Sequence, residues 1–80
     1  MAMMKTSNQP KIVTMDLSKV PSTDPLAFQQ GYLWGFTLTE QSKYEESDVS
    51  EKAVAFKEGY AIGKAVKLGN AEKPAWVTSA

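Results

Sequence analysis

Cysteine, histidine and arginine are all missing from this chain of 80 residues. Without cysteine or histidine the chain has no disulfide bond, no zinc site of the finger type, no histidine general base and no imidazole-paired nucleophile. It also contains no glycine-rich phosphate loop and no G-x-G-x-x-G segment after a strand. We therefore predict no catalytic residue, no metal site and no cofactor, and we expect a protein that is not an enzyme.

Charge and hydropathy argue against two classes of partner. Nine acidic residues balance nine basic ones, and every basic residue is a lysine. Arginine supplies the bidentate contacts by which proteins commonly read nucleic acids, so its absence makes nucleic-acid binding unexpected. No apolar run approaches the roughly 18 residues of a membrane span, and the first residues lack the apolar core of a signal peptide. The sequence therefore predicts a cytoplasmic protein without a membrane segment.

A short segment occurs twice, at residues 27–35 and at residues 55–63. Both copies read A-F-x-x-G-Y-x-x-G, and they begin 28 residues apart. A period of this length is typical of a repeated supersecondary unit. In each copy the small and apolar residues recur at intervals that place them on one side of a helix. The repeat therefore predicts two helices that present the same face to each other about a pseudo-twofold axis.

The glycines of the repeat indicate how the two helices meet. A glycine inside a helix costs about 1 kcal/mol relative to alanine, and close approach of two backbones offsets that cost. We therefore predict a mainly α fold, an αα-hairpin of two glycine-containing helices with an extended N-terminal arm or short strand. The predicted helix contact consists of Phe28, Gly31, Gly35, Phe56, Gly59 and Gly63.

The chain outside the repeat is expected to form two tails and an arm. Residues 1–10 are predicted to be a mobile tail, and residues 11–70 a single domain. Apolar and polar residues alternate at the start of this domain, which predicts an arm at 11–20. Because the chain offers no second strand, the arm is expected to lie unpaired across the helices or to pair with another subunit. Residues 71–80 are a C-terminal tail, whose Trp76 is expected to fold back on the helices.

Capping residues set the expected ends of the helices. The first helix is predicted at about 24–41, where Thr23 or Asp24 caps its free amides. The second is predicted at about 48–68, with Asp48 at its start and the left-handed stop Gly69-Asn70 at its end.

The first helix is expected to be apolar on nearly all sides, which is typical of a helix between two layers. The second layer is the arm, the C-terminal tail or the same face of a second subunit. A twofold dimer through the first helix is the simplest of these arrangements. The predicted partner or oligomer interface consists of Leu26, Leu33, Phe36, Val13 and Met15.

Three tyrosines are candidates for ligand or docking contacts. Tyr32 and Tyr60 occupy equivalent positions in the two copies, and their hydroxyls are expected to meet a shared polar spot or ligand, or to remain in water. Tyr44 lies in an acidic linker, which is either a docking patch for a basic partner or a solvated loop.

The repeat also resembles a known family. The pattern Ala27-x-x-x-Gly31-Tyr32-x-x-Gly35, then a linker with a tyrosine, then Phe56-x-x-Gly59-Tyr60-x-x-Gly63, is similar to the ribosome modulation factor family. Members are small bacterial and phage-encoded proteins of two helices joined by a linker. The resemblance covers about residues 27–66, and it implies association with the ribosome, which these proteins help to idle. The family's linker usually carries a Pro-Tyr element and its ribosome binders are strongly basic, whereas here only Tyr44 remains and the chain is neutral.

Three functions follow as expectations. The first is a small non-enzymatic interaction protein, a homo-oligomer and a phage or bacterial accessory regulator, that binds and modulates a larger protein. The second is a ribosome-associated modulator. The third is a binder of a small ligand or nucleotide in a groove lined by the glycines and tyrosines of the repeat.

Overall fold

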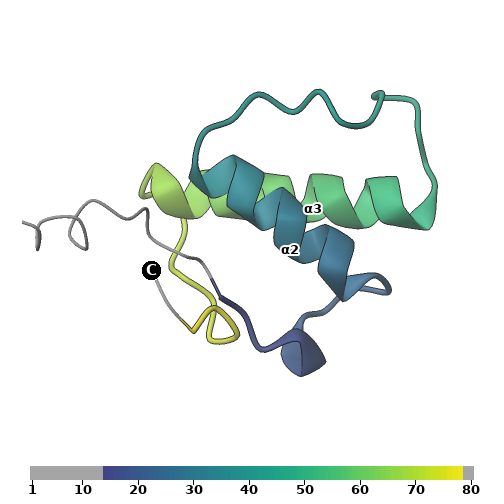
Figure 1. Ribbon diagram of the computed structural model, residues 1–80. Coiled ribbons are helices and arrows are strands. Elements are labelled where there is room, and N and C mark those ends of the chain that lie inside the picture. Colours follow the sequence, from purple (N-terminus) through teal and green to yellow (C-terminus); the bar gives the residue numbers. More distant parts are fainter. Residues whose placement is uncertain (1–13, 79–80) are drawn as a thin grey trace, which may run out of the picture.

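The computed structural model describes residues 14–78, which form two α-helices and one short 3-10 helix (Figure 1). The 3-10 helix η1 comprises Leu17–Lys19, helix α2 comprises Pro25–Phe36 and helix α3 comprises Glu51–Lys67. The two α-helices pack against each other, and residues 14–78 contain no strand. The predicted mainly α fold built on two packed helices is therefore confirmed.

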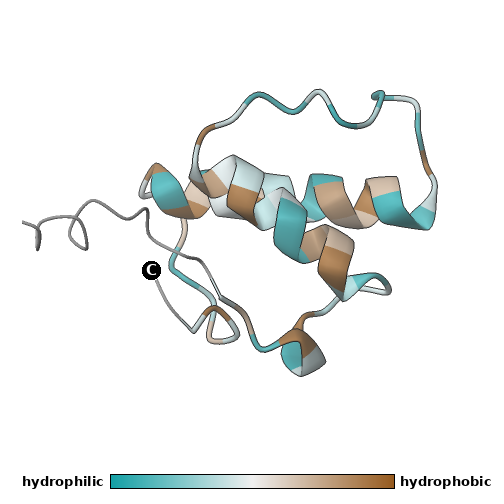
Figure 2. Ribbon diagram, viewed as in Figure 1, coloured by the Kyte–Doolittle hydropathy of each residue, from teal (hydrophilic) through white to brown (hydrophobic). Residues whose placement is uncertain are grey.

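Both helices run in the same direction through their crossing (Figure 1). At one end, the Asp24 carboxylate before α2 lies 3.5 Å from the Lys52 ammonium in the first turn of α3. At the other end, the Lys67 ammonium of α3 lies 5.3 Å from the centroid of the Phe36 ring of α2. The linker of residues 37–50 therefore runs back along the pair, and it is mostly hydrophilic (Figure 2). We call these two ends the amino end and the carboxyl end of the helix pair.

Glycines let the two backbones touch at the crossing. A Cβ atom on Gly31 would collide with the carbonyl oxygen of Phe56 and would lie only 2.8 Å from the carbonyl carbon. The equivalent glycine of the other copy, Gly59, would collide in the same way with the carbonyl oxygen of Phe28. The two contacts are related by the repeat, so the crossing has the predicted pseudo-twofold symmetry.

The same arrangement recurs one turn further along. A Cβ atom on Gly35 would collide with the carbonyl oxygen of Tyr60, and one on Gly63 with the carbonyl oxygen of Tyr32. In each case a glycine hydrogen occupies the Cβ direction and points at a carbonyl oxygen, as in a Cα–H···O contact. Such contacts contribute about 0.5–1 kcal/mol each, which offsets the helix propensity lost at glycine. The predicted helix contact residues therefore meet at the crossing.

Side-chain caps begin both helices at the amino end. The Asp24 carboxylate accepts a hydrogen bond from the Ala27 amide at 3.2 Å, and Pro25 occupies the first turn of α2, where it needs no amide partner. The Ser50 hydroxyl accepts from the Ala53 amide at 3.3 Å. Asp48 was the predicted start of the second helix, but its carboxylate accepts from the Ser50 amide at 2.9 Å. Because Asp48 forms this turn outside the helix, α3 begins at Glu51.

Helix α2 ends at Phe36, before the predicted end near residue 41. The amide of Leu38 donates to the Gly35 carbonyl at 3.0 Å, and the amide of Thr39 donates to the Trp34 carbonyl at 2.9 Å. These two bonds form a Schellman motif, which requires a left-handed residue at its turn. Leu38 takes that conformation with a φ of 58°, so the helix stops without the glycine that usually marks such an end.

Helix α3 ends in the same motif with the usual residue. The amide of Gly69 donates to the Val66 carbonyl at 3.1 Å, and the amide of Asn70 donates to the Ala65 carbonyl at 2.8 Å. Gly69 has a φ of 82°, which confirms the left-handed stop predicted at Gly69-Asn70. The two helix ends therefore differ mainly in the residue at the left-handed position.

Leu38→Gly is expected to raise the free energy of unfolding by about 1 kcal/mol, because glycine adopts a positive φ without the cost that a Cβ imposes. The Leu38 side chain is 48% exposed, so its removal sacrifices little packing. Gly69→Ala is the matched control, and it is expected to lower the free energy of unfolding by a similar amount. Urea denaturation measures both changes. A Leu38→Gly variant less stable than the parent protein would show that Leu38 contributes more by packing than it costs in backbone strain.

The C-terminal segment belongs to the domain rather than to a separate tail. Val77 is only 4% exposed and lies in the core. The Trp76 ring packs edge-on against Phe28 and Tyr32, with centroid distances of 5.3 Å and 6.1 Å. The prediction that Trp76 folds back on the helices is confirmed, whereas the boundary placed at residue 70 is wrong because the core continues to Val77.

The N-terminal arm also finds a partner within the chain. Met15 forms an isolated antiparallel bridge with Val77. The Asp16 amide donates to the Trp76 carbonyl at 2.9 Å, and the Thr78 amide donates to the Thr14 carbonyl at 2.9 Å. The expectation that the chain offers the arm no partner is therefore wrong, because the C-terminal segment supplies one. Val13 and the predicted tail at 1–10 lie outside the described residues.

Candidate functional site

The outer face of α2 is the part of the predicted interface that remains open. We define it by Leu26, Gln30 and Leu33, which lie on the side of α2 opposite its glycines. The Leu26 side chain is 66% exposed and that of Leu33 is 39% exposed. The spacing of seven residues places these two leucines one above the other along the helix. An exposed apolar pair of this kind is a candidate contact surface for another protein.

Two other residues of the predicted interface are covered by their own chain. The Phe36 ring stacks on Tyr32 at a centroid distance of 6.0 Å and an interplanar angle of 11°, and Lys67 lies over it. Phe36 is half-buried because the parallel direction of the helices brings the last turn of α3 beside it. Met15 is half-buried against the core and bridged to Val77. The predicted interface is therefore corrected to Leu26 and Leu33 among the described residues.

The two repeat tyrosines occupy different surroundings, although their positions in the repeat are equivalent. Tyr32 is fully buried between Phe36 and Trp76. Its hydroxyl has no hydrogen-bond partner among the described residues, and burial raises its pKa above the usual value. Tyr60 is half-buried and has the Lys64 ammonium 5.9 Å from its ring centroid. The C-terminal segment covers only one of the two tyrosines, so the predicted shared polar spot is not formed.

Tyr32→Phe is expected to leave the free energy of unfolding unchanged at neutral pH or to raise it by up to about 1 kcal/mol, because the lost hydroxyl is buried and unpaired. Its raised pKa means that the unfolded chain ionises first as the pH rises. The Tyr32 contribution is complete below the ordinary tyrosine pKa of about 10 and is lost as the pH rises through the higher pKa of the folded state. The advantage of the variant over the parent protein should therefore widen above about pH 10. A destabilisation of about 1 kcal/mol or more at neutral pH would instead show that the hydroxyl is hydrogen-bonded.

The linker is held against α3 by one lysine. The Lys57 ammonium donates to the carbonyl oxygens of Glu45 at 2.6 Å, Glu46 at 3.0 Å and Asp48 at 2.9 Å. Hydrogen bonds from Ser50, together with the charge of Lys57, hold the pKa of Asp48 below its usual value. The interpretation of the linker as a freely solvated loop is therefore incomplete, since its second half is fixed to α3.

Tyr44 is the point at which the linker meets the core. The Gln41 side chain donates to the Tyr44 carbonyl at 3.1 Å and accepts from the Tyr44 amide at 2.9 Å. The Tyr44 ring packs against the Phe56 ring at a centroid distance of 5.3 Å, and the Trp34 ring contacts the same phenylalanine at 5.2 Å. Tyr44 thus covers Phe56 on one side of the crossing, as Trp76 covers Phe28 on the other.

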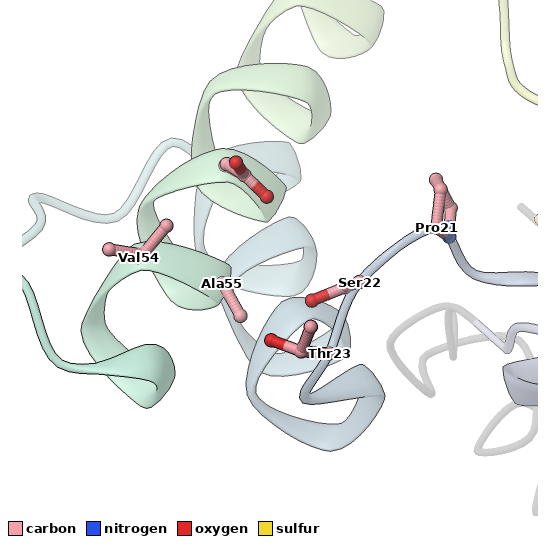
Figure 3. Close-up of a pocket in the computed structure, with 6 residues that line it drawn as sticks. Pro21, Ser22, Thr23, Val54 and Ala55 are labelled. Carbon is pink, nitrogen blue, oxygen red and sulfur yellow. The ribbon is translucent and has the colours of Figure 1, made fainter.

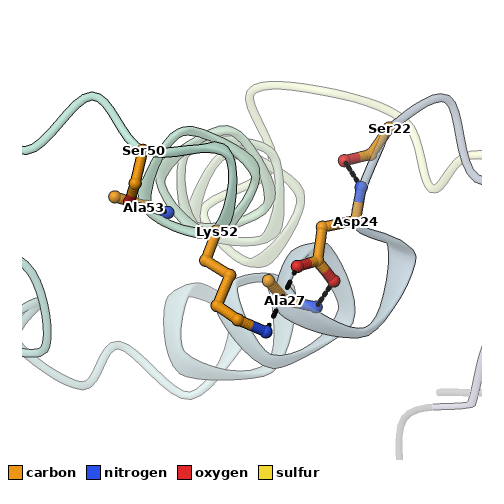
Figure 4. Close-up of polar contacts among 6 residues, drawn as sticks. All are labelled: Ser22, Asp24, Ala27, Ser50, Lys52 and Ala53. Atoms are coloured by element: carbon orange, nitrogen blue, oxygen red, sulfur yellow. Dashed lines mark hydrogen bonds and ion pairs between the residues drawn. The ribbon is translucent and has the colours of Figure 1, made fainter.

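Two cavities flank the amino end of the helix pair. The first has a volume of about 400 Å³ and lies between the segment before α2 and the first turns of α3 (Figure 3). Its lining consists of Pro21, Ser22, Thr23, Val54, Ala55 and Glu58. The second, of about 310 Å³, lies where the linker passes the first turns of both helices. Asp24 and Lys52, which pair at the amino end (Figure 4), both line the second cavity.

A third cavity, of about 370 Å³, lies on α3 near the carboxyl end. Tyr60 and Leu68 contribute to its mainly apolar wall. Within residues 14–78 no group of three or more acidic side chains is placed to hold a metal ion. The helices of this part of the chain are too short or too polar to cross a membrane.

The periodicity of apolar residues could not have identified four polar residues that hold the linker or line the second cavity. Gln41 and Lys57 hold the linker, and Lys43 and Lys52 line the cavity. All four are polar residues on solvent-facing sides of helices or in the linker, and a sequence pattern assigns such residues to water. Their roles depend on where the linker runs, which the repeat does not encode. The acidic residues at 45–48 gave no direct signal for the contact, because Lys57 binds the backbone carbonyl oxygens of Glu45, Glu46 and Asp48, which residues of any type would supply.

Comparisons of the sequence with protein-family models, with curated proteins and with solved structures find no match. The resemblance to ribosome modulation factors therefore depends on the residues of the repeat alone.

Proposed function

We propose that this protein is a small non-enzymatic interaction protein that associates with itself through the outer face of α2 and modulates a larger protein in the cytoplasm. The observation that carries the proposal is the exposure of Leu26 and Leu33 on the side of α2 that faces away from α3. The glycine faces of both helices are already used at the crossing. The remaining apolar surface of α2 is therefore available for a second protein chain.

The energy available from this face is large relative to the stability of a small domain. Leu26 and Leu33 are 66% and 39% exposed, so together they offer about as much area as one fully exposed leucine, whose burial contributes on the order of 1.5–3 kcal/mol per chain by area transfer. Two leucines thus supply an amount comparable with the few kcal/mol of net stability expected for a chain of this size. A twofold arrangement would place the same pair from each copy in contact, as an isologous interface requires.

Sedimentation velocity over a concentration series tests the self-association. The parent protein is expected to form a dimer, and the double variant Leu26→Gln with Leu33→Gln is expected to be a monomer with unchanged helix content. Leu68→Gln is the matched control, because Leu68 is 53% exposed but lies at the carboxyl end of α3. A parent protein that is monomeric at every concentration, or a control that dissociates as readily, would contradict the proposal.

The same variants test the interaction with a larger protein. Crosslinking in a cell lysate is expected to join the parent protein and Leu68→Gln to a partner that the double variant fails to reach. Sedimentation of the lysate through a sucrose cushion at physiological salt tests ribosome association, which the family resemblance implies. Recovery of the double variant with the same partner would show that the outer face of α2 is not the binding surface.

A further inference from the structure

The cavity beside the linker is built from three separate parts of the chain. Its volume is about 310 Å³, which is within the range of small-molecule sites. Three of its residues come from α2, one from the capping position before α2, two from the linker and one from α3. The lining residues are Asp24, Leu26, Ala27, Gln30, Lys43, Tyr44 and Lys52. We refer to this site as the linker cavity.

The charges around the linker cavity favour an anion. Lys43 and Lys52 provide two ammonium groups, and Asp24 provides one carboxylate. That carboxylate is already engaged, since it accepts from the Ala27 amide at 3.2 Å and lies 3.5 Å from the Lys52 ammonium. Lys43 forms no ion pair within the part of the chain that the structure describes. The cavity therefore has a net positive charge.

The direction of the helices adds to this positive charge. Because α2 and α3 are parallel, the amino ends of both helices lie at the same end of the molecule (Figure 4). Asp24 and Lys52, at these two ends, both line the linker cavity. The amino end of a helix carries a partial positive charge from its aligned peptide groups. An antiparallel pair would place only one such end here.

The wall on the linker side is fixed in position. Gln41 makes two hydrogen bonds to the Tyr44 backbone, and the Tyr44 ring rests on Phe56. Lys57 holds the next part of the linker through three carbonyl groups. A preformed wall reduces the ordering cost of binding.

We propose that the linker cavity binds a small organic anion, such as a carboxylate or a phosphate monoester with an apolar body. The ammonium groups of Lys43 and Lys52 contact the anionic group, and the Gln30 amide donates a further hydrogen bond to it. Leu26, Ala27 and the Tyr44 ring contact the apolar body. The site shares Leu26 and Gln30 with the outer face of α2, so the ligand is expected to compete with the proposed self-association. Lys43 and Lys52 lie outside that face, so their replacement tests the anion site alone.

A titration with phenyl phosphate, monitored by NMR of the Gln30 side-chain amide and the Ala27 backbone amide, tests the proposal. Saturable shifts at these two groups are expected in the parent protein. The double variant Lys43→Gln with Lys52→Gln is expected to bind at least about tenfold more weakly, since a hydrogen bond to a charged group contributes at least that factor. The double variant Lys64→Gln with Lys67→Gln changes the net charge equally at the carboxyl end and is expected to bind as the parent protein does.

Titrations with benzyl alcohol and with inorganic phosphate test separately how much the apolar ring and the anionic group of the ligand contribute to binding. Benzyl alcohol, which has the ring without the charge, and inorganic phosphate, which has the charge without the ring, are each expected to bind more weakly than phenyl phosphate. The proposal would be overturned if both lysine double variants lost the same affinity for phenyl phosphate, or if benzyl alcohol bound as tightly as phenyl phosphate. The absence of a saturable shift with phenyl phosphate would also overturn it.

Discussion

Gly31→Ala is expected to lower the free energy of unfolding by about 3–5 kcal/mol, which is enough to unfold most molecules of so small a domain. The added Cβ would lie 2.8 Å from the carbonyl carbon and 3.0 Å from the Cα atom of Phe56, and closer still to the carbonyl oxygen. These are backbone atoms of α3, so they cannot rotate away as the end of a side chain would. The two helices would have to move apart, and the packing of the crossing would be lost.

The sign of this effect distinguishes the crossing from an ordinary helix position. Glycine to alanine in an exposed helix interior stabilises by about 1 kcal/mol, because alanine has the higher helix propensity. Gly59→Ala is expected to match Gly31→Ala, since it meets the carbonyl group of Phe28 in the equivalent way. Ala61→Gly, at an exposed position of α3, is the control and is expected to cost only about 1 kcal/mol. Denaturant unfolding provides the measurement, and a stabilised Gly31→Ala variant would show that the backbones are not in contact.

Trp76→Ala is expected to lower the free energy of unfolding by about 3 kcal/mol. The Trp76 ring covers Phe28, which is 1% exposed, and Tyr32, which is fully buried. Its removal would open both rings to water and weaken the pairing of the two terminal segments, in which the Asp16 amide donates to the Trp76 carbonyl. Thermal unfolding followed by circular dichroism measures the change.

Two variants provide the controls for this prediction. Trp76→Phe keeps an aromatic ring and is expected to lose less than half as much stability. Leu68→Ala removes an exposed side chain and is expected to change the free energy of unfolding by no more than about 0.5 kcal/mol. If Trp76→Ala were as mild as Leu68→Ala, the C-terminal segment would not be part of the folded domain.

The helices and their contact face were predictable because the same pattern of small and apolar residues occurs twice in the sequence. Small and apolar residues at helical intervals define a face whatever the rest of the chain does. Gly31 and Gly59 stand out on that face, since an interior glycine is unfavourable in a helix unless something approaches it closely. The structure places a backbone carbonyl at each of them.

The relative direction of the helices could not be read from the same pattern. A glycine-lined face is compatible with a parallel or an antiparallel partner, because the intervals between small residues are the same in both. The linker at 37–50 permits either direction, since an extended chain advances about 3.3 Å per residue and a helix rises only 1.5 Å. The positions of Phe36 and the linker cavity both depend on this direction, so they were not predictable.

The early end of α2 has a local cause that residue preferences obscure. Leucine favours helices, and nothing in its preference indicates a left-handed residue at Leu38. The Thr37 hydroxyl donates to the Leu33 carbonyl at 2.9 Å, and Thr39 completes the Schellman motif. Threonine side chains that bond to nearby backbone in this way compete with helix continuation. Thr37 was therefore a usable signal, whereas Leu38 was not.

Nuclear Overhauser effects between the two helices test the glycine crossing most directly. The structure predicts contacts from the Hα protons of Gly59 to the amide proton of Tyr32, and from those of Gly35 to the amide proton of Lys64, because a Cβ in these directions would lie 2.9 Å and 2.8 Å from the two nitrogens. Observation of both contacts would establish that the backbones touch and that the helices run parallel. Absence of both, or glycine contacts in the reverse order along α3, would contradict the account.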